Sequence, residues 1–237
     1  MRAKADLHNH SCLSPCGSLK MSPAVLARRA ASQGIEILAL TDHNTARNLP
    51  AFKECCEIED IVPIFGMEVN TSEEVHVVCL FGSIEVALSF GEYVESHLPA
   101  VRNRPEIFGD QVIVDADENI IGYLDPLLFS STSISFSALI ARVLELDGLV
   151  IPAHIDRFSN GAVSQLGFLP DLPYTAVEVL HLPCSYETYD NTVITGSDAH
   201  HPEDVGIRSF YIDDIGEVSF PQLRESLLSG SVTLKRA

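Results

Sequence analysis

The chain has 237 residues, 46% of them hydrophobic, so it can bury a large core and is too apolar to be disordered. Fifteen Lys and Arg residues face 33 Asp and Glu residues, which gives a formal net charge of −18. Because an acidic protein repels phosphate backbones, this charge argues against nucleic acid as a partner.

Short apolar segments with strand character alternate with helical segments along most of the chain. Strands are expected at residues 3–8, 35–41, 61–69, 73–81, 149–154, 176–181, 192–198 and 210–214. Helices are expected at residues 23–33, 49–57, 84–98, 135–148 and 220–230. This alternation predicts one α/β domain over residues 1–237, with a largely parallel sheet that favours a barrel over an open sheet.

The regular alternation is interrupted between Pro99 and Ser137. This stretch contains a predicted hairpin at residues 111–124, with its turn at Asp117 to Asn119, followed by a serine-rich segment. We interpret residues 99–137 as an insertion between barrel elements. It either caps the active site or forms an enlarged loop without substrate contact, and the sequence leaves both alternatives open.

The N-terminus lacks the apolar core and cleavage signature of a signal peptide, and no apolar run approaches the ~18 residues of a membrane helix. The six cysteines have no disulfide-framework spacing. We therefore expect reduced thiols, no membrane partner and a cytoplasmic location. The sequence does not predict the oligomeric state.

Histidines and carboxylates stand at the ends of several apolar segments. His8 and His10 follow the first strand, and Asp198 and His200 follow a later strand with the same spacing. Residues i and i+2 of a strand point to the same side, so each pair can reach one ion. Other strands place further histidines at comparable positions, namely His43, His76 and His154. The pattern predicts a site for several divalent metal ions.

Two carboxylates fit into this pattern. Glu68 ends an apolar strand, where an unpaired charge would be costly, and a glutamate can bridge two cations with its two oxygens. Asp6 lies on the same face of the first strand as His8 and His10, so it is a candidate for orienting a ligand by a hydrogen bond.

Six motifs, in order along the chain, resemble the motif series of the PHP (polymerase and histidinol phosphatase) superfamily: DLHNHS, TDHN, GMEV, VHVV, PAH and GSDAH. The resemblance runs from Asp6 to His200. It implies a distorted (β/α)7 barrel with two or three divalent ions, which would be zinc, manganese or iron.

Carried over by position, the resemblance assigns one ion to His8, His10, Glu68 and Asp198. Glu68 would bridge to a second ion, bound also by His76 and His154.

A third ion would use His43, His200 and a residue of the loop after the first motif. Relatives place an aspartate or histidine in that loop, whereas this chain has Cys16 there. A thiolate suits zinc better than manganese or magnesium. Cys16 is therefore either the last ligand of the third ion or a loop thiol beside a weaker or absent site.

Three further residues are candidates for catalysis. Arg157 follows His154 by three positions and could bind phosphate oxygens bidentately, or it could form a surface salt bridge with Asp156 or another acid. His200 or His201 could protonate the leaving oxygen.

The residue types and the resemblance together predict a metal-dependent phosphoric ester hydrolase. A metal-bridging hydroxide would attack a small phosphomonoester or phosphodiester, which makes a small phosphorylated molecule the expected partner. Two alternatives remain: an exonuclease acting on nucleic-acid ends, and a metal-binding regulatory protein without turnover.

Overall fold

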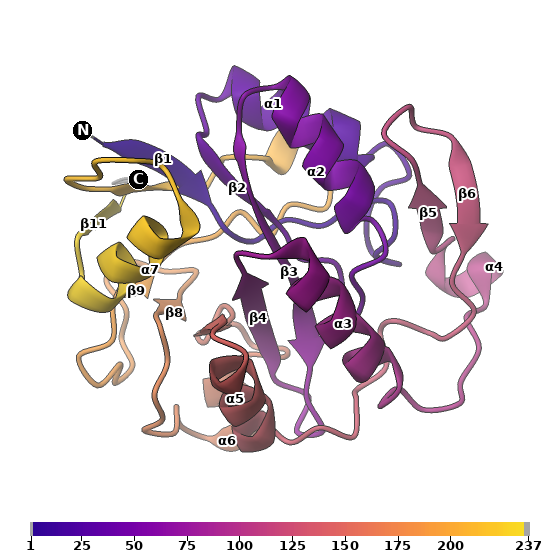
Figure 1. The fold of residues 1–237 in the computed structure, drawn as a ribbon. Coiled ribbons are helices and arrows are strands. Elements are labelled where there is room, and N and C mark those ends of the chain that lie inside the picture. Colours follow the sequence, from indigo (N-terminus) through magenta and orange to yellow (C-terminus); the bar gives the residue numbers. More distant parts are fainter. Residues whose placement is uncertain (1, 235–237) are drawn as a thin grey trace.

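In the computed structural model, which describes residues 2–234, a seven-stranded sheet forms the centre of the molecule (Figure 1). The strand order is β11-β10-β1-β2-β3-β4-β7. The strands are β1 (Ala3–Asp6), β2 (Ile37–Leu40), β3 (Val62–Asn70), β4 (His76–Phe81), β7 (Leu149–Pro152), β10 (Phe210–Ile212) and β11 (Val232–Leu234).

The sheet is mixed, so the expectation of a largely parallel sheet is wrong. β1, β2 and β3 run parallel, but β4 is antiparallel to both β3 and β7, and β10 is antiparallel to both β1 and β11. The reason lies in the connections. β3 ends at Asn70 and β4 begins at His76, and so short a link joins antiparallel strands, whereas a parallel pair needs a crossover of a dozen residues or more.

Two short parallel strands, β8 (Val177–Glu178) and β9 (Val193–Ile194), lie between the far edge of the sheet and β1. Thr175 N donates to Val150 O on the β7 side, and Asp198 N donates to His8 O on the β1 side. The main sheet therefore curls into a half-barrel, with this strand pair bridging its open side.

Helices pack on both faces of the curled sheet, with α7 on the face opposite to the other long helices (Figure 1). Ser22, Ser83 and Ser135 each cap a helix, because each hydroxyl accepts a hydrogen bond from the backbone N–H three residues ahead. The helices are α1 (Pro23–Ser32), α2 (Leu49–Ile58), α3 (Ile84–Glu95), α4 (Pro105–Phe108), α5 (Phe136–Glu145), α6 (Ala162–Leu166) and α7 (Phe220–Ser229), with a 3-10 turn at Pro202–Asp204.

Strand residues are buried on both faces, which explains why the strands are continuous apolar runs. Along β2, Leu38 and Leu40 pack toward α1 and α2, whereas Ile37 and Ala39 belong to a second core that includes Leu223 of α7. Because apolar residues cover both faces of the sheet, the polar side chains of the strands gather at one end of the sheet.

The insertion forms the predicted hairpin from β5 (Val112–Val114) and β6 (Ile120–Tyr123), which lies beside α2 in Figure 1. Asn48 fastens it, donating to Val112 O at 3.3 Å and accepting from Val114 N at 3.0 Å. The following segment, 128–130, approaches the ends of β2 and β3. Whether the insertion caps the active site stays a prediction.

The expected location depends on two further expectations, the absence of membrane helices and the reduced state of the cysteines. Within residues 2–234, no helix combines the length and apolar character needed to cross a bilayer. All six cysteines are free thiols. The cytoplasmic location stays a prediction.

Candidate metal centre

The fold brings the histidines predicted from the strand ends to one place. His8 and His10 follow β1, His43 follows β2, and Glu68 lies in β3. His76 is the first residue of β4, yet it reaches the same end, because β4 runs antiparallel and pairs with Asn70 at the end of β3. Because β4 runs antiparallel, its first residue, His76, lies at the end of the sheet where the other donors gather. In a parallel strand the first residue would lie at the opposite end.

One group of donors consists of His8, His10, Glu68 and Asp198, whose ligand atoms all lie within 4.8 Å of one another. His8 Nε2 and His10 Nε2 are 3.3 Å apart. Asp198 Oδ1 lies 3.3 Å from His8 Nε2 and 3.2 Å from His10 Nε2. Glu68 Oε1 and Oε2 lie 3.3 Å from the same two nitrogens, respectively.

These donors fit a cation. A tetrahedron with metal–ligand bonds of about 2.0–2.1 Å has edges of about 3.3 Å, which matches the mutual distances among His8 Nε2, His10 Nε2 and Asp198 Oδ1. Among residues 2–234, neither Glu68 Oε2 nor Asp198 Oδ1 has a hydrogen-bond partner, although histidine nitrogens lie 3.1–3.3 Å from both. Carboxylate oxygens buried this close together are stabilised by a positive charge between them, which a metal ion would supply.

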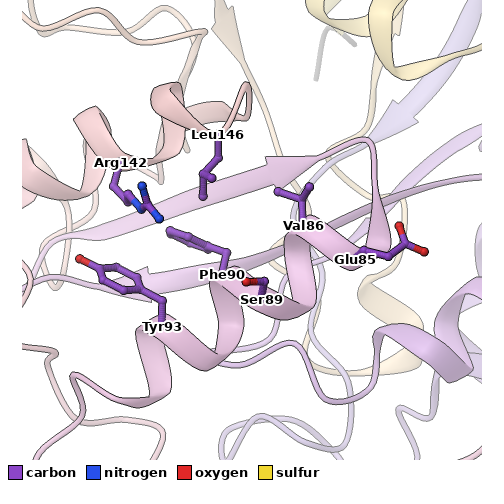
Figure 2. Close-up of a pocket in the computed structure, with 7 residues that line it drawn as sticks. All are labelled: Glu85, Val86, Ser89, Phe90, Tyr93, Arg142 and Leu146. Atoms are coloured by element: carbon purple, nitrogen blue, oxygen red, sulfur yellow. The ribbon is translucent and has the colours of Figure 1, made fainter.

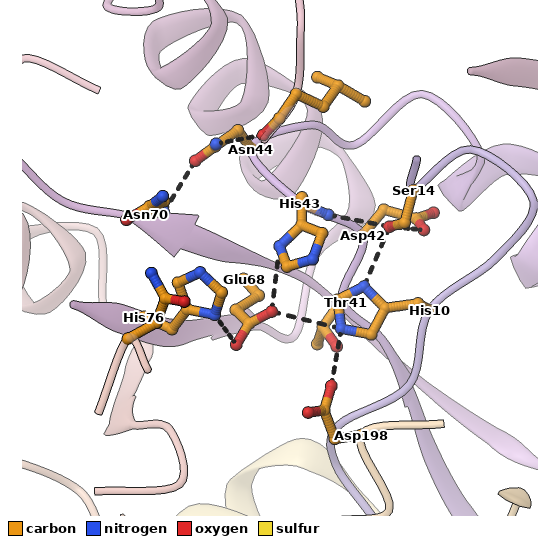
Figure 3. Close-up of polar contacts among 12 residues, drawn as sticks. His10, Ser14, Thr41, Asp42, His43, Asn44, Glu68, Asn70, His76 and Asp198 are labelled. Carbon is orange, nitrogen blue, oxygen red and sulfur yellow. Dashed lines mark hydrogen bonds and ion pairs between the residues drawn. The ribbon is translucent and has the colours of Figure 1, made fainter. Parts of the chain in front are cut away.

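Glu68 also belongs to a second group, together with His43 and His76 but without His154 (Figure 3). Its Oε1 lies 2.8 Å from His76 Nδ1 and 3.0 Å from His154 Nε2, and its Oε2 lies 3.1 Å from His43 Nδ1. Glu68 is 1% exposed, so both oxygens are shared entirely among these neighbours. One carboxylate thus stands between two donor groups, which is the arrangement expected of a bridging ligand.

A third group comprises His10, His43 and His200. His10 Nδ1 is 3.0 Å from Ser14 Oγ, so only its Nε2 faces the centre, and that nitrogen already belongs to the first group. Cys16 lines a cavity together with His43 and His200, but it is not among the residues that form the three clusters in the described chain. Its role as a ligand stays a prediction.

Three residues outside the clusters, Glu178, Ser14 and Asp42, fix the orientation of the histidine rings. His8 Nδ1 lies 3.0 and 3.1 Å from the two oxygens of Glu178, which is 2% exposed and also accepts from His154 N at 3.1 Å. A histidine that donates from Nδ1 presents the lone pair of Nε2 to the centre.

The same arrangement recurs at His10, which meets Ser14 Oγ, and Ser14 Oγ donates to Asp42 Oδ1 at 2.7 Å. Sequence reasoning missed Glu178 and Ser14. The available signal was a single acidic residue in the otherwise apolar strand AVEVLH, since a buried carboxylate needs a partner.

The pKa values of the histidines in the centre are shifted in opposite directions. Burial alone would lower the pKa of His8 and of His10, but the neighbouring carboxylates raise it, to about 9 at His10, so a bound metal ion would have to displace a proton from these two rings. Burial alone would raise the pKa of Glu68 and of Asp198, but the surrounding histidines lower the pKa of both carboxyls. Burial and the charge of His10 lower the pKa of His43 well below its usual value and that of His200 to about 4. Ionised carboxylates and neutral imidazoles are the protonation states that bind metal ions.

Two residues of the centre have strained backbones. His154 has a φ of 30° and Asp198 a φ of 47°, in the left-handed region that side chains other than glycine seldom adopt. Such strain persists where the surrounding structure imposes it, and it concentrates at functional sites. At His154 the hydrogen bond from its N to Glu178 fixes the conformation.

The other candidates lie as follows. Arg157 is part of the site, since its Nη1 donates to Asp198 Oδ2 at 2.9 Å and its Nη2 lies 3.4 Å from His76 Nδ1. His201 is exposed and does not line the cavity. Asp6 accepts from Ser197 N and Gly206 N, both at 3.1 Å, and its carboxylate also has a backbone hydrogen bond at His8, so its role in orienting a ligand stays a prediction. Through Ser197, Asp6 holds the segment that leads to Asp198.

The centre opens into a cavity of about 310 Å³. Its walls are Cys16, His43, Asn70, His76, Phe129, Arg157, Ser159, Asn160 and His200. A separate pocket lies on the outside between α3 and α5, and Figure 2 shows its lining residues, such as Phe90 and Arg142. That outer pocket contains none of the clustered histidines. Ligand chemistry is therefore concentrated in the first cavity.

Comparisons with known proteins agree with this geometry. The family model described as PHP domain matches residues 6–148. Over 83 residues the chain is 39% identical to a 5'-3' exoribonuclease from Haemophilus influenzae, and this alignment covers 34% of the chain and 29% of that protein. The chain spans less than a third of the length of the two curated relatives it matches, with shares of 6% and 29%.

Solved structures share the fold at low identity. A lesion-specific endonuclease from Pyrococcus furiosus superposes with a TM-score of 0.70 and 18% identity, over 99% of this chain and 58% of that chain. A protein assigned as a metal-dependent phosphoesterase from Bifidobacterium adolescentis gives a TM-score of 0.58 and 18% identity, over 95% and 96% of the two chains.

One of these structures corrects the expectation about partners. Endonuclease Q has been solved with a 27-mer duplex substrate that carries an abasic lesion at the active site, and it matches with a TM-score of 0.71, 18% identity and the same coverage of 99% and 58%. A chain of this fold thus receives nucleic acid in that protein. The argument from net charge against nucleic acid as a partner is therefore wrong, because net charge does not describe the field at the site.

Proposed function

The chain belongs to the PHP domain family, and from this premise we propose that it is a hydrolase that cleaves phosphoric esters at the cluster around Glu68 with the help of bound divalent ions. The observation that carries the proposal is the pair of carboxylate oxygens, Glu68 Oε2 and Asp198 Oδ1, that stand beside histidine nitrogens without a hydrogen bond from residues 2–234. Cation binding would explain this arrangement.

We assign the ligands as follows. His8, His10, Glu68 and Asp198 would hold one ion. Glu68 would share a second ion with His76 and His154, whose ring nitrogens lie 2.8 and 3.0 Å from its Oε1. A third ion would use His43 and His200, with Cys16 as a further ligand. The distances support the first site most directly, because the cluster around Glu68 and His76 contains His43 and not His154, and His10 Nε2 can serve only one ion at a time.

When bound, zinc, manganese or iron would act as a Lewis acid and would lower the pKa of water at the site. The chain's own groups would do the rest. Arg157, whose guanidinium lines the cavity, would bind phosphoryl oxygens and offset their charge. Of the two candidate proton donors, His200 lines the cavity and His201 does not. Because its pKa is lowered to about 4, His200 would donate a proton to the leaving oxygen only in its protonated form, and only where it does not bind the third ion.

A second candidate is hydrolysis at nucleic-acid ends. The stretch of 39% identity with an exoribonuclease favours it, although that stretch covers 29% of the relative. The alternative of a metal-binding protein without turnover would share the ligands but not the activity.

The test is hydrolysis by protein loaded separately with zinc, manganese or iron. Substrates should include p-nitrophenyl phosphate, its bis ester and a 5'-phosphorylated single-stranded oligonucleotide. We expect turnover of at least one, and a loss of about 100-fold or more, with loss of bound metal, in His8→Ala and Asp198→Asn. Metal binding without any turnover would overturn the proposal in favour of the non-catalytic alternative.

A further inference from the structure

One wall of the metal cavity differs in character from the others. Phe129 is a hydrocarbon ring among histidines, amides and an arginine, and it is 39% exposed. Its ring centroid lies 5.5 Å from that of His43, and Phe108 contacts it edge-on with the centroids 6.4 Å apart. An apolar ring held at the mouth of a charged site leaves part of its surface in water, where it gains nothing unless a ligand covers it.

The backbone that carries Phe129 is fastened from two sides. Asn44 Nδ2 donates to Leu128 O at 2.8 Å and to Ser130 O at 3.0 Å. Asn70 Nδ2 donates to Phe129 O at 3.3 Å. Asn44 and Asn70 are buried at the ends of neighbouring strands and lie next to His43 and His76 in Figure 3. Phe129 is therefore held by the same strand ends that carry the histidines.

Asn70 offers a second signal. It lines the cavity and is only 5% exposed, and its Oδ1 accepts no hydrogen bond from the described chain, residues 2–234. Its Nδ2 is already used by Phe129 O, so the free group is an acceptor. A buried acceptor without a donor is unfavourable, and a ligand N–H in the cavity would satisfy it.

We propose that Phe129 and Asn70 form a subsite for a planar nitrogen heterocycle, so that the ester cleaved at the metal centre carries a nucleobase. The inference rests on the proposed hydrolysis and names its substrate class. Phe129 supplies an aromatic surface on which a base stacks, and Asn70 Oδ1 accepts a hydrogen bond from a base N–H. Arg157 and the metal ligands, on the other walls of the same cavity, receive the phosphate.

The test compares adenosine 5'-monophosphate with ribose 5-phosphate, an ester of the same sugar that has a hydroxyl at C1 in place of the base. In the metal-loaded wild-type protein we expect the nucleotide to have the higher kcat/KM. Phe129→Ala should lower kcat/KM for the nucleotide by about 5-fold to 150-fold, the range of one stacked base, and change that for ribose 5-phosphate by less than about twofold. Phe129→Trp should retain the preference.

Two controls separate the subsite from stability. Phe168→Ala removes another ring that is 60% exposed but lies outside the cavity lining, and it should leave both substrates unchanged. Phe129→Leu keeps apolar bulk without an aromatic face, so it should fold normally and still lose the preference for the nucleotide. A Phe129→Leu protein that kept the preference would overturn the stacking role.

Binding measurements keep this inference distinct from the proposed hydrolysis. If wild-type protein binds adenosine 5'-monophosphate and Phe129→Ala binds it more weakly, the subsite stands even where no ester is cleaved. If both esters are cleaved equally well and Phe129→Ala affects them alike, the subsite is wrong while the hydrolysis stands. A 5'-phosphorylated dinucleotide tells whether the base belongs to a free nucleotide or to the end of a strand.

Discussion

Glu178 lies behind the metal centre and fixes two of its histidines at once, His8 through the ring Nδ1 and His154 through the backbone N–H. Both contacts depend on a buried carboxylate. Replacing Glu178 by Gln keeps the shape and one acceptor but removes the charge that orients His8. We expect metal affinity to fall about 10-fold to 100-fold with the fold intact, as measured by metal content after dialysis and by circular dichroism.

The matched control is Glu95→Gln. Glu95 is also largely buried and ion-paired, but its partners are Arg47 and Thr45, away from the histidines. That variant should bind metal like the wild type. Equal loss of metal in both variants would mean that Glu178 acts through general stability and not through His8.

Gly196 leaves the space that Glu178 occupies. A Cβ at this position would lie 2.3 Å from Glu178 Oε2 and 2.8 Å from His8 Cβ. Gly196→Ala should therefore displace Glu178 and destabilise the protein by about 1–3 kcal/mol, as overpacking does. The Tm of thermal unfolding and the metal content should both decrease. Gly216→Ala is the control, because nothing lies within 4 Å of its Cβ position, and an unchanged Tm in Gly196→Ala would refute the steric argument.

The sequence predicted the inner residues of the centre better than the outer ones, for a physical reason. His8, His10 and Asp198 could be grouped because a spacing of two places side chains on one face of an extended chain. The contact between Glu178 and His8 spans 170 positions, and no local pattern records it. Phe129 was missed for the same reason, since its place at the cavity depends on buried amides of distant strands.

At the scale of elements, the apolar runs located the strands but not their directions. Alternation with helices predicted parallel pairing, which holds for β1, β2 and β3. β4 follows β3 without a helix, and the short link forces it back beside β3. The length of the connection therefore determines whether a strand runs parallel or antiparallel to its neighbour. The composition of the strand does not, because buried strands of either direction are apolar runs.

The hairpin of β5 and β6 depends on Asn48, whose side chain takes the place of a neighbouring strand. It donates to Val112 O, accepts from Val114 N and is 1% exposed. Asn48→Ala leaves two buried backbone groups unpaired, so we expect the hairpin amides to exchange with solvent at least about 10-fold faster. Hydrogen exchange resolved over residues 111–124 measures this.

In the same experiment, amides of β3 should keep their protection, because their partners lie within the sheet. Accelerated exchange throughout the chain would contradict a local role for Asn48. Unchanged exchange in the hairpin would show instead that Glu118, which binds Arg28 and Ser22 of the α1 region, suffices to hold it.

At the scale of the whole molecule, the net charge and the local charge at the cavity act on a phosphate substrate in opposite directions. We call these the two levels of charge. The net charge of −18 repels any polyanion at long range. Bound divalent ions and Arg157 would attract phosphate at short range, inside the cavity. A basic nuclease gains affinity from both levels, whereas this chain would gain only from the second.

The two levels can be separated by ionic strength, because salt screens distant surface charges more than a contact inside a cavity. For a 5'-phosphorylated oligonucleotide we expect kcat/KM to rise about twofold or more between about 20 mM and about 200 mM KCl, as screening removes the long-range repulsion. A nuclease with a basic track loses affinity over such a range. Adenosine 5'-monophosphate carries less charge and should show a smaller rise. A falling kcat/KM for the oligonucleotide would mean that a basic path leads to the cavity despite the net charge.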